Sequence, residues 1–162
     1  MKNKLWIIAI IAIIGLLMAA CEEPADVPPG SEGNPIPLTE NTWKQGSLPD
    51  SESKTWYSFE VESDTTYYIW VKERFTSPAG SHTSYADVML TAKYKDGAII
   101  FENSESGTDA STAATSNRPA SNFDASKNGT VLVRVFPATG TIPTYGEFKV
   151  AFTTVDSRPS GE

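Results

Sequence analysis

The feature of this sequence that most constrains its fold is a repeated alternation between apolar and more polar side chains. The clearest case is Val131, Val133 and Val135, with Arg134 on the opposite face. The same alternation occurs in the stretches Tyr57–Val61, Tyr67–Val71, Val88–Tyr94 and Phe148–Phe152. Because successive side chains of a β-strand point to opposite faces, each stretch predicts a strand with one buried face. No stretch shows a convincing helical period.

Turn-forming residues stand between the predicted strands. Asp96-Gly97 follows Tyr94, and Asn128-Gly129 precedes the valine-rich strand. Such pairs favour tight hairpin turns. The residues 62–64 leave no room for more than a hairpin between two further strands. Several short strands without helices between them predict an all-β, antiparallel sandwich or barrel.

The N-terminal segment has the pattern of a secretory signal. Lys2 and Lys4 precede an uncharged, largely apolar run, 5–20, which ends in small residues just before the only cysteine, Cys21. The run is slightly short for a transmembrane helix, which needs about 20 apolar residues. An ordinary cleaved signal also fits, but it leaves Cys21 as an unexplained odd thiol. The stretch Leu17–Cys21 resembles the lipobox of bacterial lipoproteins, which implies that Cys21 carries acyl chains such as palmitate.

Lipidation of Cys21 implies a membrane anchor and an extracytoplasmic location. Two or three acyl chains hold a protein stably, whereas one chain alone is marginal. Glu22 is not the aspartate that some bacteria use for inner-membrane retention, so the outer membrane or cell surface is expected. The predicted organisation is a signal peptide (1–20), the lipidated cysteine with a flexible linker (21–34), a β-sandwich domain (35–155) and a disordered tail (156–162).

The charge balance excludes one class of partner. The chain has 13 Lys and Arg residues against 20 Asp and Glu residues, which gives a formal net charge of −7. Nucleic-acid binding depends largely on Lys and Arg contacts to phosphates, so no nucleic-acid partner is expected. The same balance argues against a basic patch that docks on anionic lipid. Its simplest consequence is solubility.

The order of the segments after the linker forms a recognisable pattern. In chain order these are Ile36–Trp43, Gly46, Lys54–Val61, Tyr67–Val71, Ala86–Leu90, Phe123–Ala125, Gly129–Val135 and Tyr145–Val150. Together they resemble the bacterial pre-peptidase C-terminal (PPC) domain, a small β-sandwich found behind the catalytic domains of secreted proteases. The resemblance implies a jelly-roll-like sandwich of about eight strands that binds protein or polysaccharide. It implies no particular ligand, because similar modules bind different molecules.

No catalytic activity is expected from the residue pattern. The only histidine, His82, lies in the polar stretch 80–84. A nucleophilic triad needs a base that is held by an acid and lies close to its serine. A zinc site needs several His or Cys ligands, and this chain has one of each. The sequence therefore predicts that the protein is not an enzyme.

A structural calcium ion is a candidate cofactor. Calcium takes oxygen ligands from carboxylates and carbonyls, which makes Asp64 and Asp87 the candidate ligands. Binding modules related to the PPC family often hold such an ion. The chain has no EF-hand loop, however, and acids at strand ends also serve as solvated caps. Both interpretations stay open.

Trp43, Trp56 and Trp70 are the candidate ligand-binding residues. Each lies either on the strand face opposite to the best apolar stripe or on a face that the pattern does not assign. Exposed rings would act as stacking platforms for sugars, whereas covered rings would supply buried area to the fold. The prediction is a lipid-anchored, non-catalytic module that binds an extracellular protein or glycan. The alternative is a structural or assembly lipoprotein that docks to another envelope protein.

Overall fold

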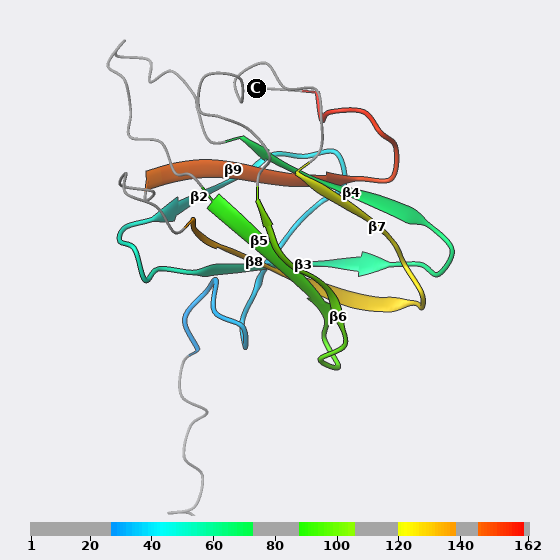
Figure 1. Ribbon diagram of the computed structural model, residues 1–162, viewed down its shortest axis with the longest axis horizontal. Coiled ribbons are helices and arrows are strands. Elements are labelled where there is room, and N and C mark those ends of the chain that lie inside the picture. The colour runs from blue at the N-terminus through cyan, green and yellow to red at the C-terminus, as the bar shows by residue number, and fades with distance from the viewer. Residues whose placement is uncertain (1–26, 73–87, 106–119, 139–145, 161–162) are drawn as a thin grey trace, which may run out of the picture.

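The computed structural model describes residues 27–72, 88–105, 120–138 and 146–160. Within those ranges every regular element is a β-strand, as Figure 1 shows. The strands are β1 (Ile36–Pro37), β2 (Lys44–Leu48), β3 (Thr55–Val61), β4 (Thr66–Lys72), β5 (Val88–Tyr94), β6 (Ile99–Glu105), β7 (Ser121–Asp124), β8 (Gly129–Pro137) and β9 (Gly146–Thr153). No helix in these ranges is long and apolar enough to cross a membrane.

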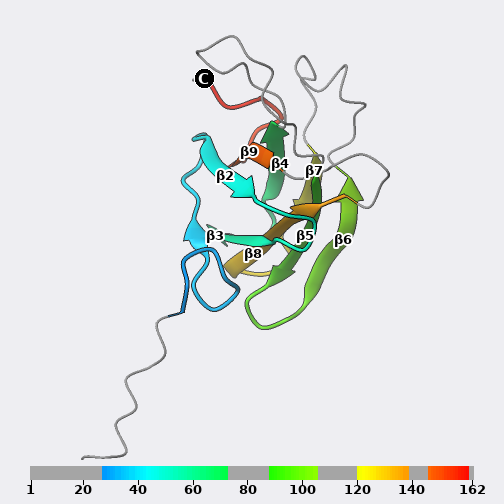
Figure 2. The ribbon, with the colours of Figure 1, turned by 90° about the vertical axis from the view of Figure 1, so that its left-hand side faces the viewer.

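The strands form two sheets that face each other. The five-stranded sheet has the order β1-β3-β8-β5-β6, and the four-stranded sheet has the order β2-β9-β4-β7. Figure 2 shows these two layers. All pairings are antiparallel except the short parallel contact of β1 with β3. Only the β5–β6 hairpin joins consecutive strands within one sheet. The hairpins expected at 62–64 and at Asn128-Gly129 are wrong, because these turns connect strands of different sheets, β3 to β4 and β7 to β8. The predicted all-β, jelly-roll-like sandwich is confirmed.

The hydrophobic core lies between the two sheets and is built by the inward side chains of the alternating strands. Near its centre the rings of Phe59 and Phe152, from opposite sheets, stack with centroids 4.2 Å apart. Tyr67 and Phe123 stack at 5.6 Å. The valine stripe of β8 is fully buried, at Val131, Val133 and Val135. The period of two in the sequence thus identified the inward faces correctly.

One end of the core depends on a close approach to Gly46 of β2. The Tyr57 hydroxyl would lie 2.2 Å from a Cβ atom at Gly46, and a ring carbon of Phe148 would lie 2.4 Å from it. Tyr57 is fully buried, and its hydroxyl has no hydrogen-bond partner among the described residues. Burial raises the pKa of this phenol, because the ionised form would lose its hydration. Any side chain at Gly46 would displace one of these rings.

The ordered domain begins earlier than the sequence indicates. The flexible linker was expected to extend to Asn34, but residues 27–34 form a turn that packs against β3. The amide of Gly30 donates to the carbonyl of Asn34 at 2.8 Å, and the amide of Trp56 donates to the carbonyl of Gly30 at 2.8 Å. Gly30 has φ +81°, a conformation that glycine adopts without strain. These backbone hydrogen bonds hold the segment in a defined turn, although its composition is typical of a flexible linker.

Candidate functional site

Trp70 lies on the outer face of the four-stranded sheet, but it is not exposed there. Its neighbours Ile69 and Val71 point into the core, so the indole points away from it. Even so, only 2% of Trp70 is accessible to solvent. The indole N–H donates to Thr153 Oγ1 at 2.8 Å, and that hydroxyl donates to the carbonyl of Val155 at 2.7 Å. This tryptophan is therefore part of the packed structure.

Trp43 is held by the C-terminal segment. Its indole N–H donates to the carbonyl of Pro159 at 3.2 Å, and the guanidinium of Arg158 lies 5.6 Å from the ring centroid. Pro159 is itself buried. Arg158 and Pro159, which were expected to belong to a disordered tail, thus contact Trp43. Here the packing interpretation of the tryptophans fits better than an open stacking platform.

Trp56 lies on the outer face of the other, five-stranded sheet, and cations cover its ring. The Lys93 amino group is 5.0 Å from the ring centroid, and the guanidinium of Arg134 is 5.8 Å from it. Trp56 is 6% exposed. A cation over the face of an indole is attracted by the ring quadrupole. The face of Trp56 is thus in contact with two cations, and the stacking role stays a prediction.

Arg134 is the centre of this second surface. Its guanidinium lies 4.5 Å from the ring centroid of Phe136, and Nη2 donates to Thr91 Oγ1 at 3.3 Å. Its Nε atom is buried and has no partner among the described residues. The strand register explains the cluster, because Arg134 on β8 pairs with Trp56 on β3 and with Thr91 on β5. We call Trp56, Thr91, Lys93, Arg134 and Phe136 the cation–aromatic cluster.

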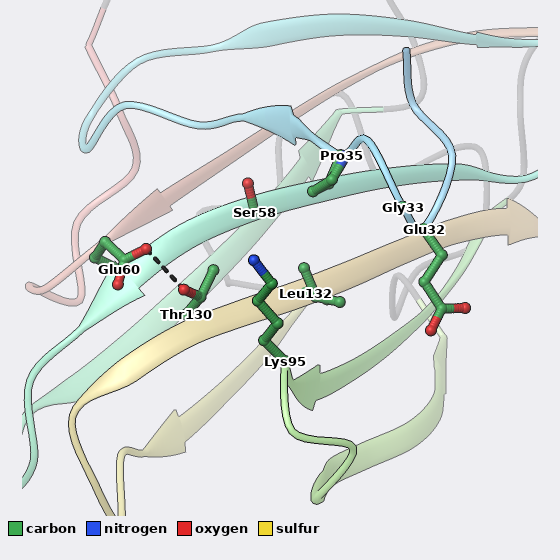
Figure 3. Close-up of a pocket in the computed structure, with 8 residues that line it drawn as sticks. All are labelled: Glu32, Gly33, Pro35, Ser58, Glu60, Lys95, Thr130 and Leu132. Carbon is green, nitrogen blue, oxygen red and sulfur yellow. Dashed lines mark hydrogen bonds between the residues drawn. The ribbon is translucent and has the colours of Figure 1, made fainter. Parts of the chain in front are cut away.

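A groove runs beside this cluster, between the sheet and the N-terminal turn. It consists of two hollows of about 630 Å³ and 340 Å³. The larger is lined by Glu32, Gly33, Pro35, Ser58, Glu60, Lys95, Thr130 and Leu132, and the smaller by Pro28, Pro29, Gly30, Ser31, Glu32, Lys54 and Trp56. Figure 3 shows the larger hollow. Because Glu32 and Trp56 line the smaller hollow, the groove and the cluster are continuous.

The groove brings together groups of opposite charge and several hydroxyls. Glu32 forms an ion pair with Lys93 at 2.5 Å, which ties the N-terminal turn to β5. Thr130 donates a hydrogen bond to Glu60 at 2.8 Å between the neighbouring strands β8 and β3, beside the larger hollow. In Figure 3 Lys95 reaches over the sheet toward Ser58. Such a set of donors and acceptors suits a polar ligand rather than an apolar one.

Of the two candidate calcium ligands, only Asp64 lies in the described part of the chain. Asp64 is exposed in the β3–β4 turn, where its φ is 63° and its amide donates to the carbonyl of Ala125. Asp87 lies outside the described residues, as do His82 and the predicted lipidation site, Cys21. Among the residues that are described, no group of three or more His, Cys, Asp or Glu side chains could hold a metal ion.

Comparison with known proteins gives likenesses in fold alone. No family model matches the chain, and no curated protein matches it. The similar solved structures include the pre-peptidase C-terminal domain of a collagenase from Bacillus anthracis, with 18% sequence identity and a TM-score of 0.45. The likeness covers 74% of this chain and 95% of that domain. The PPC resemblance stays a prediction, because a score this low supports no further argument.

Sequence reasoning missed the residues that build the groove. Arg134 was noticed only as the polar residue opposite the valine stripe, and Lys93 and Glu32 were not singled out. Two signals could have found them. Lys93 and Lys95 flank the inward Tyr94 at the end of β5. Arg134 lies between the inward Val133 and Val135 of β8. What the sequence does not contain is the register that places these strands side by side.

Proposed function

We propose that this protein is a lipid-anchored component of the cell envelope whose β-sandwich binds an extracellular protein or polysaccharide and performs no catalysis. The observation that supports the binding role is the groove beside the cation–aromatic cluster. Hydroxyl, carboxylate and amino groups converge there on a concave surface. A concave surface with a few convergent polar groups is the default indication of a ligand site.

The anchor part of the proposal rests on the N-terminal sequence, and the N-terminal turn gives it a geometric consequence. Val27 is the first described residue and begins the turn that borders the groove. Residues 22–26 span at most about 20 Å when fully extended, at roughly 3.3–3.6 Å per residue. A lipid on Cys21 would thus keep the groove close to the membrane surface. The ligand is then a component of the envelope or a molecule held at it.

The anchor is tested by Cys21→Ser in the full chain. We expect the variant to lose its acyl label and to leave the membrane fraction, whereas Glu23→Gln, two residues away, should keep both. Acyl labelling and fractionation of the expressing cells measure the two effects. Unchanged labelling of Cys21→Ser would rule out this anchor.

The binding role is tested with the full chain in detergent against immobilised matrix proteins and a glycan panel. Thr130→Tyr places a ring in the larger hollow, and Ser47→Tyr adds the same ring on exposed β2 in the other sheet. We expect saturable binding that falls at least about tenfold in Thr130→Tyr only, because the ring occludes the contact surface. Equal affinities of the two variants would place the site elsewhere. No binding to any probe would favour the envelope-assembly alternative.

A further inference from the structure

The outer face of the five-stranded sheet gathers cations on an otherwise acidic protein. Lys54 precedes β3, Lys93 and Arg134 lie on β5 and β8, and Lys95 follows β5. The side chains of Trp56, Arg134 and Thr91 share one row across three strands, and those of Ser58, Leu132 and Lys93 share the next. Glu60 and Thr130 share a third row, and the amide of Lys95 donates to the carbonyl of Thr130. The full chain carries a net charge of −7, so this is a local reversal.

Most of these cations have no acidic partner in the described part of the chain. Glu32 pairs with Lys93. Lys54, Lys95 and Arg134 have no ion pair with any described carboxylate. Lys54 and Lys95 are exposed, and each lines one of the two hollows. The positive charge along the groove is therefore available to a ligand.

Arg134 is pre-arranged for an anion. The rings of Trp56 and Phe136 lie within 5.8 Å of its guanidinium, and Thr91 accepts a bond from one terminal nitrogen. These contacts hold the Arg134 side chain in place before any ligand binds. The entropy cost of ordering it on binding is therefore small. Because Nε is buried and Nη2 donates to Thr91, the guanidinium offers an anion only its remaining terminal N–H groups, as charge-assisted donors.

The groove also holds acceptors that a purely anionic ligand would not use. The carboxylates of Glu32 and Glu60 lie within it, together with the hydroxyls of Ser58 and Thr130. Carboxylates repel a uniformly acidic surface, but they accept hydrogen bonds from the hydroxyls of a sugar. A planar layer of anionic headgroups or a run of acidic side chains offers few such donors. The mixed set fits a molecule with both hydroxyl and carboxylate groups.

We propose that this groove binds a polysaccharide that carries carboxylate groups, such as a polyuronic acid. Its carboxylates bind Lys54 and Lys95, which line the two hollows, and approach Arg134 beside Trp56 at the edge of the smaller hollow, while its hydroxyls donate to Glu32 and Glu60. This inference rests on the proposed binding function and names the class of its ligand.

The test measures binding of the full chain in detergent to polygalacturonate at two ionic strengths. The matched competitors are polygalacturonate with its carboxyls reduced to alcohols, poly-glutamate, and vesicles of anionic phospholipid. We expect saturable binding to polygalacturonate alone, with an affinity that falls as salt rises because exposed charges are screened. Lys54→Gln and Lys95→Gln should each weaken it about threefold to tenfold, as expected for lost charge-assisted hydrogen bonds.

Lys44→Gln is the control, because it removes one exposed lysine from β2 of the other sheet. Its affinity for polygalacturonate should equal that of the parent protein. Equal binding of the reduced polymer, of poly-glutamate or of the vesicles would overturn the proposal. So would unchanged affinity in both Lys54→Gln and Lys95→Gln. Binding to a protein or a neutral glycan without polygalacturonate would overturn this inference while leaving the general binding function intact.

Discussion

Both sheets of the sandwich carry outward tryptophan residues. The C-terminal segment contacts Trp43 near one sheet, whereas the N-terminal turn lies beside Trp56 on the other. On the four-stranded sheet, Trp70 is hydrogen-bonded to Thr153, and the C-terminal segment holds Trp43 through Pro159. On the five-stranded sheet, the N-terminal turn lies beside Trp56 and leaves a groove. Both Trp56 and Trp70 are buried, so an outward tryptophan alone does not identify a binding surface. The difference between the two faces is the groove beside Trp56.

The comparison predicts that the covered face stabilises the fold. Trp70→Ala should lower the free energy of unfolding by about 3–5 kcal/mol, because a buried ring is replaced by a cavity. Its affinity for any ligand of the groove should stay unchanged as long as the protein is folded. Denaturant unfolding of the full chain in detergent measures the first quantity. A loss below about 1 kcal/mol would show that the face is not packed as described.

The hydrogen bond beneath Trp70 should have a smaller effect. Thr153→Val keeps the shape of the side chain but leaves the indole N–H buried without an acceptor. We expect a loss of about 1–3 kcal/mol in unfolding free energy, the usual penalty for a buried unsatisfied donor. Thr39→Val, at an exposed threonine whose hydroxyl has no hydrogen bond to a described residue, is the matched control. Equal effects of the two variants would mean that the indole does not depend on Thr153.

The contact between Trp43 and the C-terminal segment should contribute still less to the free energy of unfolding. Trp43→Phe keeps an aromatic ring and removes the N–H that donates to Pro159. We expect about 0.5–1.5 kcal/mol of lost stability, the net value of a typical hydrogen bond. Cleavage on the N-terminal side of the exposed Asp156 by an aspartate-specific endoprotease should also become faster, and its rate measures the opening of this segment. An unchanged cleavage rate would show that Trp43 does not hold the segment.

The ion pair on the open face should contribute least to stability. Glu32→Gln removes the partner of Lys93, whose side chain is 23% exposed. Partly exposed ion pairs are worth about 0–1 kcal/mol, so thermal unfolding should change little. A large destabilisation would mean that the groove is a structural joint rather than a binding surface, and it would remove the contrast between the two faces.

The sequence predicted the sandwich well because alternation alone determines which residues of a strand point inward. Val131, Val133 and Val135 needed no knowledge of their neighbours to be placed in the core. The groove needed more, because Trp56, Lys93 and Arg134 meet only through the register of three strands. The order of residues 27–34 was missed because it depends on backbone bonds to Gly30 and Asn34, which composition does not reveal.

The measurement that tests the account most directly is a titration followed through the indole N–H signals of the ¹⁵N-labelled protein. Polygalacturonate is added to the full chain in detergent, and the shifts of Trp43, Trp56 and Trp70 are compared after assignment by Trp→Phe variants. The account predicts that the Trp56 signal moves, while the signals of Trp43 and Trp70 stay where they are. Movement of Trp43 or Trp70 with a stationary Trp56 would contradict it and would place the binding surface on the other sheet.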